Sequence, residues 1–126
     1  MLGMKRCAVV IACMAGACAP IDREAARQDA LALRPAGEPV DCISISGIRR
    51  SEVIDDRTID FHMAGGRVLR NHLPNQCPGL GFDKAFAYSP GVSRLCAVDI
   101  ITVVRQGGGR GASCGLGKFQ PVERAP

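Results

Sequence analysis

Seven cysteines carry the clearest chemistry of this chain of 126 residues. Three of them lie within the first 18 residues, and the other four are Cys42, Cys77, Cys96 and Cys114. An even number of widely spaced cysteines in a small domain is typical of a disulfide framework, provided that the chain reaches an oxidising compartment. We therefore predict two disulfides in the body of the chain.

Four cysteines allow three disulfide connectivities. We assume that the segments 94–104 and 112–119 pair as strands across the glycine-rich run between them. Cys96 and Cys114 would then be too far apart for a disulfide, which requires Cα atoms within about 7 Å. Of the pairings that remain, we prefer Cys77–Cys96 together with Cys42–Cys114.

Zinc binding and a reactive thiol are the alternatives for these cysteines. The four residues stand singly, without the paired Cys-x-x-Cys spacing of a structural zinc site. A nucleophilic cysteine also needs a neighbouring base, and the sequence ties neither histidine to a cysteine. We expect no metal and no cofactor.

Histidine and carboxylate side chains could perform acid–base chemistry. His62 and His72 are expected on the outward face of two neighbouring strands, near Asp60. Asp99 lies in an apolar segment that should be buried, where a carboxylate needs a partner such as an arginine. A periplasmic enzyme would combine Asp99 or Asp60 with His62 or His72 in a pocket. The alternative reading is the polar face of a sheet and a structural ion pair.

The positive net charge of the chain, with 16 basic against 12 acidic residues, suggests an anionic partner. The candidate binding residues are Arg67, Arg70, His72 and Asp99, with an anionic envelope component or another envelope protein as the partner. Nucleic acid is not expected, because only 4% of the residues are aromatic and could stack on bases.

Alternating apolar residues and frequent Gly, Pro and Asp turns predict an all-β domain at residues 42–122, a small twisted antiparallel sheet or partly closed barrel of about six strands. Its centre is expected to be one long strand over 94–104, apolar on both faces. No helix is predicted inside the domain.

Three turns can be read directly. Asp55-Asp56 is a turn signature, although Asp55, Asp56 and Asp60 could also form an acidic site. A three-residue turn after Met63 pairs Phe61 with Leu69 and Asp60 with Arg70, which keeps apolar with apolar and acid with base. The run 107–111 lacks the Lys-Ser/Thr ending of a phosphate loop, so it is interpreted as a flexible hairpin loop.

The N-terminal segment has the composition of a signal peptide. Lys5 and Arg6 precede an uncharged apolar run, and small residues end it at Ala17. Met14–Cys18 is similar to a bacterial lipobox, with Ala15 where leucine is preferred, so Cys18 is the predicted lipidation site and Ala19 behind it favours the outer membrane. The alternative is ordinary cleavage and a soluble periplasmic or secreted protein.

The predicted organisation is therefore a signal peptide at 1–17, a lipidated tether and linker at 18–41, the domain at 42–122 and a frayed tail at 123–126. One short helix or a mobile tether is expected over 21–33. Two prolines and a glycine make regular structure unexpected over 34–39.

Six segments in order resemble a family of small exported Gram-negative proteins with a domain of unknown function: 42–46, 53–59, 70–74, 77–80, 95–102 and 114–119. The resemblance covers about residues 40–122. It implies an exported β domain with paired cysteines and supplies no activity, substrate or catalytic residue.

Overall fold

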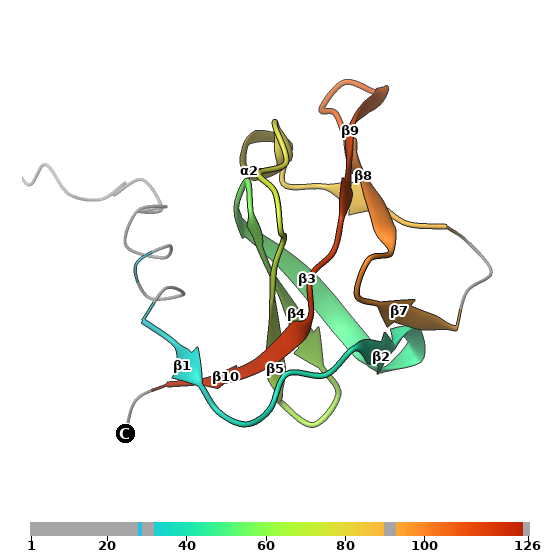
Figure 1. Cartoon of the computed structure of the whole chain (residues 1–126). Helices are drawn as coiled ribbons and strands as arrows, with labels where there is room; N and C mark the ends of the chain where they lie inside the picture. The colour runs from blue at the N-terminus through green and yellow to red at the C-terminus, as the bar shows by residue number, and fades with distance from the viewer. Residues whose placement is uncertain (1–27, 29–31, 90–92, 125–126) are drawn as a thin grey trace, which may run out of the picture.

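Antiparallel strands make up most of the computed structural model, which describes residues 28, 32–89 and 93–124 (Figure 1). The predicted all-β class is confirmed, with the strands divided among three sheets. The strands are β1 (Arg34–Pro35), β2 (Cys42–Ser44), β3 (Ile48–Asp55), β4 (Thr58–Met63), β5 (Val68–His72), β6 (Phe86–Ala87), β7 (Arg94–Cys96), β8 (Ile100–Val104), β9 (Arg110–Gly115) and β10 (Phe119–Glu123).

The largest sheet has the order β1-β10-β5-β4-β3, and its centre is the predicted hairpin of β4 and β5. Phe61 pairs with Leu69 and Asp60 with Arg70, so the predicted register is confirmed. Matching apolar residues set this register, because a slip of one residue would move every side chain to the other face.

Two smaller sheets complete the domain, one of β2 and β7 and one of β6, β8 and β9. Between β2 and β3 the chain bends through a 3-10 turn at Ile45–Gly47. The β8–β9 hairpin closes through Gly107, Gly108 and Gly109, which all have positive φ. Side chains would be strained in that conformation, which accounts for the glycine run.

The expected long central strand is wrong. Residues 94–104 form two strands, β7 and β8, in different sheets, separated by a turn at Ala97–Asp99. Val98 has a φ of 69°, which is unusual for a β-branched residue and ends strand pairing there. Nor is β8 apolar on two buried faces, because Ile101 and Val103 are fully buried whereas Ile100 and Val104 are exposed.

The core lies between the large sheet and the two small ones. Phe61 stacks edge-on against Phe119 and Phe86, with ring centroids 5.4 and 6.1 Å apart. Around these rings pack buried side chains of all three sheets: Ile43, Val53, Ile59, Met63, Leu69, Leu95, Ile101 and Val103. The three aromatic rings therefore link the large sheet to the sheet of β6, β8 and β9 in a domain that has no tryptophan.

The disulfides are Cys42–Cys96 and Cys77–Cys114, so the preferred pairing was wrong. Cys42 and Cys96 are directly opposed in β2 and β7, with Cα atoms 4.0 Å apart. The preference failed because it continued β8 back to Cys96, whereas the turn at 97–99 carries Cys96 into another sheet. The exclusion of a Cys96–Cys114 bridge agrees with the structure.

Three further expectations are corrected by the structure. Arg34 and Pro35 form β1 and pair with Glu123 and Val122 of β10, so regular structure begins within the predicted linker. For the same reason Glu123 belongs to a strand and not to a frayed tail. A one-turn helix, α2 (Leu80–Asp83), which the sequence did not predict, begins after Gly79 in the left-handed conformation.

Several predictions lie outside the described residues. They are the signal peptide, the lipidation site Cys18, most of the segment 21–33 and the end of the tail at 125–126.

Candidate functional site

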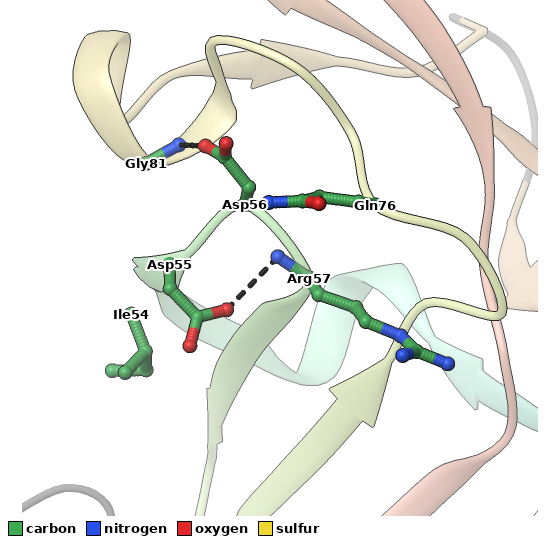
Figure 2. A pocket seen from close by; sticks show the side chains of 6 residues that line it. All are labelled: Ile54, Asp55, Asp56, Arg57, Gln76 and Gly81. Atoms are coloured by element: carbon green, nitrogen blue, oxygen red, sulfur yellow. Dashed lines mark hydrogen bonds between the residues drawn. The ribbon is translucent and has the colours of Figure 1, made fainter.

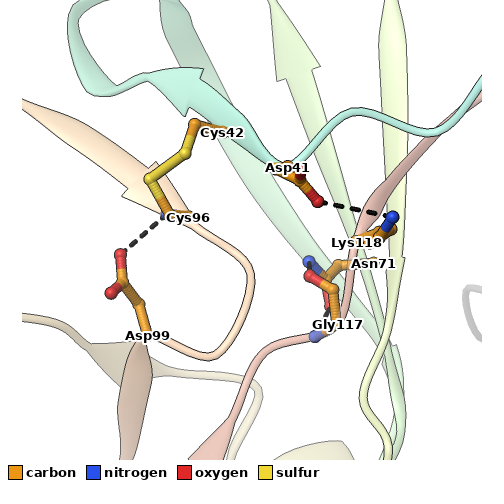
Figure 3. The surroundings of a disulfide bond; sticks show 7 residues. All are labelled: Asp41, Cys42, Asn71, Cys96, Asp99, Gly117 and Lys118. Carbon is orange, nitrogen blue, oxygen red and sulfur yellow. Dashed lines mark hydrogen bonds and ion pairs between the residues drawn. A yellow bond between two sulfur atoms is a disulfide. The ribbon is translucent and has the colours of Figure 1, made fainter.

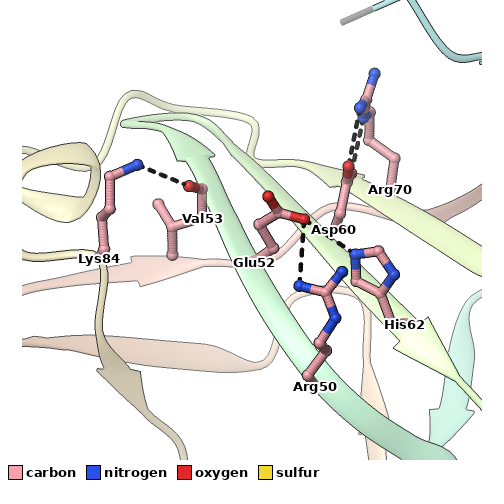
Figure 4. A network of polar contacts seen from close by, with 7 residues as sticks. All are labelled: Arg50, Glu52, Val53, Asp60, His62, Arg70 and Lys84. Atoms are coloured by element: carbon pink, nitrogen blue, oxygen red, sulfur yellow. Dashed lines mark hydrogen bonds and ion pairs between the residues drawn. The ribbon is translucent and has the colours of Figure 1, made fainter. Parts of the chain in front are cut away.

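A buried ion pair lies at the centre of the outward face of the large sheet (Figure 4). Arg70 Nε donates to Asp60 Oδ1 at 2.8 Å, and Nη2 donates to Oδ2 at 2.9 Å. The two residues are 5% and 1% exposed. Because β4 and β5 pair them directly, the acid and the base meet in a bidentate geometry that satisfies both charges.

A second polar cluster adjoins this pair on β3 and β4. His62 Nε2 lies 3.1 Å from Glu52 Oε2, and a guanidinium nitrogen of Arg50 lies 3.6 Å from the same oxygen. Figure 4 shows Arg50 and His62 both pointing at the Glu52 carboxylate. These groups are partly exposed, so an external polar molecule could reach them.

An open groove of about 530 Å³ runs across this face of the sheet. Cationic, anionic and apolar side chains all contribute to it. The lining residues are Leu33, Arg50, Glu52, Asp60, His62, Gly66, Val68, Val122, Glu123 and Arg124. Such a mixed lining suits a partner that has both polar and apolar parts.

The structure separates the predicted binding residues. Arg70 is buried against Asp60, and His72 is exposed on the same face with its Nδ1 3.2 Å from Thr58 Oγ1. Arg67 is exposed and lines a different groove of about 400 Å³ with Met63 and Leu69. Arg67 precedes β5, and Leu69 lies on the face of that strand opposite to the face of Arg70 and His72.

Asp99 lies in the turn between β7 and β8, apart from those residues. The backbone N–H of Cys96 donates to Asp99 Oδ2 at 2.7 Å, beside the Cys42–Cys96 disulfide (Figure 3). Its partner is therefore a backbone amide where we expected an arginine. The carboxylate shapes the turn that separates β7 from β8.

The predicted pairs of Asp60 or Asp99 with a histidine are not among the contacts of the described residues. The carboxylate that meets a histidine is Glu52, which the sequence reasoning missed. A signal was present, because matching Val53 with Ile59 places Glu52 opposite Asp60 and diagonal to His62. That match requires the bulge between Val53 and Asp55, which alternation alone does not reveal.

The two adjacent aspartates form the predicted turn. Asp55 Oδ1 accepts a hydrogen bond from the Arg57 N–H at 2.9 Å, and Asp56 Oδ1 accepts one from Gly81 at 2.7 Å (Figure 2). Beside them is an open hollow of about 580 Å³, which Ile54 and Gln76 also line. Asp56 therefore anchors α2 to the β3–β4 turn, and Asp60 lies apart in the buried pair.

The buried side-chain amide of Asn71 joins β5 to the segment between β9 and β10, near the Cys42–Cys96 disulfide (Figure 3). Asn71 Nδ2 donates to the Gly117 carbonyl oxygen at 2.7 Å, and the Gly117 N–H donates to Asn71 Oδ1 at 2.8 Å. Nearby, Lys118 Nζ lies 3.6 Å from Asp41 Oδ1. Asn71 thus acts as a strand partner for the chain between β9 and β10.

No group of three or more His, Cys, Asp and Glu side chains within 28, 32–89 and 93–124 is placed to hold a metal ion. None of the helices in these ranges has the length and apolar character that a membrane span requires. Two disulfides indicate a location outside the cytoplasm, where thiols are not kept reduced. Comparison with protein-family models, curated proteins and solved structures found no match to this chain.

Proposed function

We propose that this protein is an exported cell-envelope lipoprotein that acts as a binding or structural module. The observation that carries the proposal is the pair of disulfides, which together involve all four cysteines beyond residue 18. Disulfides of this kind persist in the periplasm and are rare in the cytosol. The signal-like segment 1–17 and the lipobox-like Met14–Cys18 supply the route and the anchor.

The binding part of the proposal is supported by the shape and chemistry of the surface. The grooves are open and lined with both charged and apolar side chains. Asp60 and Arg70 are buried at one of these grooves, whereas the neighbouring Glu52, His62 and Arg50 are partly exposed and available for recognition. The partner class is an anionic envelope component or another envelope protein, and the attachment point is the outer membrane.

Intact-mass analysis of the protein recovered from bacterial membranes tests this proposal. We expect the mass of a chain that begins at Cys18 and carries a lipid, and a further rise on reduction equal to the hydrogens that two disulfides take up. The Cys18→Ser variant is the control, because it removes the acceptor thiol and leaves the domain unchanged. Recovery of an uncleaved chain with free thiols from the cytosol would refute the proposal.

A periplasmic enzyme is the second candidate, favoured by the contact of His62 with Glu52 in the groove. A carboxylate can orient a histidine that acts as a general base. Hydrolysis of nitrophenyl esters or phosphates by the wild type and not by His62→Gln would support it. Equal background rates for both proteins would remove this candidate for those substrates.

A further inference from the structure

Strand β8 exposes apolar side chains on its outer face. Val98, just before the strand, is 81% exposed, Ile100 is 57% exposed, and Val104 is also exposed. The alternate residues Ile101 and Val103 are fully buried, so the strand has one core face and one outer face. We name Val98, Ile100, Thr102, Val104 and Arg110 the β8 face.

Small residues surround these apolar side chains. Gly115 is opposite Ile100 on β9, and Ser113 and Ala87 flank Thr102 on β9 and β6. Phe82 of α2 is also strongly exposed, and its neighbour Asp83 accepts a hydrogen bond from the Gln106 N–H beyond the end of β8. The aliphatic groups of the β8 face therefore project beyond their neighbours.

Two arginines lie at the end of the β8 face, Arg110 within it and Arg105 next to it. Arg110 is directly opposite Val104, and Arg105 follows the strand. Neither guanidinium has an ion-pair partner within the described part of the chain. The nearby carboxylates of Asp83 and Asp99 instead accept hydrogen bonds from the backbone N–H groups of Gln106 and Cys96.

We propose that the β8 face docks on an anionic phospholipid surface. Aliphatic side chains can enter the boundary between headgroups and acyl chains, while arginines beside them pair with the phosphates. The inference deepens the proposed envelope location and rests on it. An anchor at Cys18 leaves room for this contact, because the chain between Cys18 and Arg34 spans at most about 55 Å when extended.

Charge complementarity favours a lipid surface over a second copy of this chain. A second copy docked symmetrically on the β8 face would either bring Arg105 and Arg110 of both copies together, where like charges repel, or place them over the apolar Val98 end of the other copy. A layer of phosphates offers the opposite charge to both arginines at once.

A tryptophan at Ile100 tests the proposal, since the chain has no other tryptophan. The full chain with Cys18→Ser and Ile100→Trp is mixed with vesicles of phosphatidylethanolamine and phosphatidylglycerol. We expect the emission to shift to shorter wavelength, as it does when an indole leaves water. Val40→Trp in the same background is the matched control, because Val40 is 41% exposed and lies outside the β8 face.

Charge variants test the role of the arginines. Arg105→Gln with Arg110→Gln is expected to weaken vesicle binding of the Ile100→Trp protein about 25-fold, at about fivefold for each arginine. Arg49→Gln with Arg94→Gln removes the same charge from exposed sites outside the β8 face and should leave binding unchanged.

Three results would overturn the proposal. The first is an unchanged emission wavelength of the Ile100→Trp protein when vesicles are added, and the second is an equal wavelength shift for Val40→Trp. The third is a shift without vesicles that grows with protein concentration, which would assign the β8 face to a second copy. The readout does not depend on lipid at Cys18, so failure of the anchor and failure of the docking surface are told apart by mass analysis and by fluorescence.

Discussion

Asp60 and Arg70 illustrate how much depends on single residues in this domain. Both side chains are almost entirely removed from water, and two hydrogen bonds of 2.8 and 2.9 Å join them. Buried pairs of this kind contribute little net stability, because desolvation offsets their attraction. Their main consequence is that loss of one partner leaves the other charge buried and uncompensated.

We therefore predict that Arg70→Met lowers the free energy of unfolding by about 3–5 kcal/mol. Urea denaturation measures the change. The double variant Asp60→Leu with Arg70→Met should be more stable than Arg70→Met alone, because it removes the uncompensated carboxylate. Arg50→Met is the control, since an exposed pair contributes less than about 1 kcal/mol. Equal losses for Arg50→Met and Arg70→Met would contradict the prediction.

The segment between β9 and β10 connects the sheet of β6, β8 and β9 to the large sheet. It crosses beside β5, where Asn71 accepts and donates the two hydrogen bonds with Gly117. A Cβ atom at Gly117 would fall inside contact distance of the His72 carbonyl oxygen. The crossing therefore requires both the amide at position 71 and the glycine at position 117.

Gly117→Ala is expected to lower the free energy of unfolding by about 2–4 kcal/mol, because backbone must move to admit the methyl group. Gly115→Ala, at the last residue of β9, is a close control, since its Cβ would meet Ile100 Cδ1 at an ordinary 3.9 Å. We expect a change within about 0.5 kcal/mol for the control. Both values follow from urea denaturation, and similar losses for the two variants would refute this account of the crossing.

At the scale of the whole molecule, the two disulfides link segments that are far apart in the sequence. Cys42–Cys96 joins the two strands of the smallest sheet, and Cys77–Cys114 fixes the loop after β5 to β9. The closed loops span 54 and 37 residues, for which the chain-entropy account expects about 4 kcal/mol each.

Removal of either disulfide should therefore destabilise the domain strongly. Cys77→Ala with Cys114→Ala is expected to cost more than Cys42→Ala with Cys96→Ala, because Cys77 is fully buried in the core and its loss adds a cavity. Thermal unfolding of the two double variants measures the difference. The opposite order, or a non-reduced digest that links Cys77 to Cys96, would contradict the prediction.

Local patterns in the sequence were sufficient for much of the fold. Alternation and turn residues predicted the β class, and apolar matching predicted the register of β4 with β5, including the pairing of Asp60 with Arg70. Both depend on residues close together in the chain, where one hairpin turn leaves few registers to choose from. The number of cysteines also predicted two disulfides, because a count requires no knowledge of which cysteines lie close together.

Only the tertiary structure decided which distant segments meet. The turn at Val98 divides an apolar run between two sheets. Cys96 therefore lies opposite Cys42 and forms a disulfide with it, and Cys114 forms its disulfide with Cys77. The bulge in β3 brings Glu52 to His62, and β10 recruits Arg34 from beyond the predicted domain boundary. These contacts are set by the packing of the whole core, which no alternation along a single segment encodes.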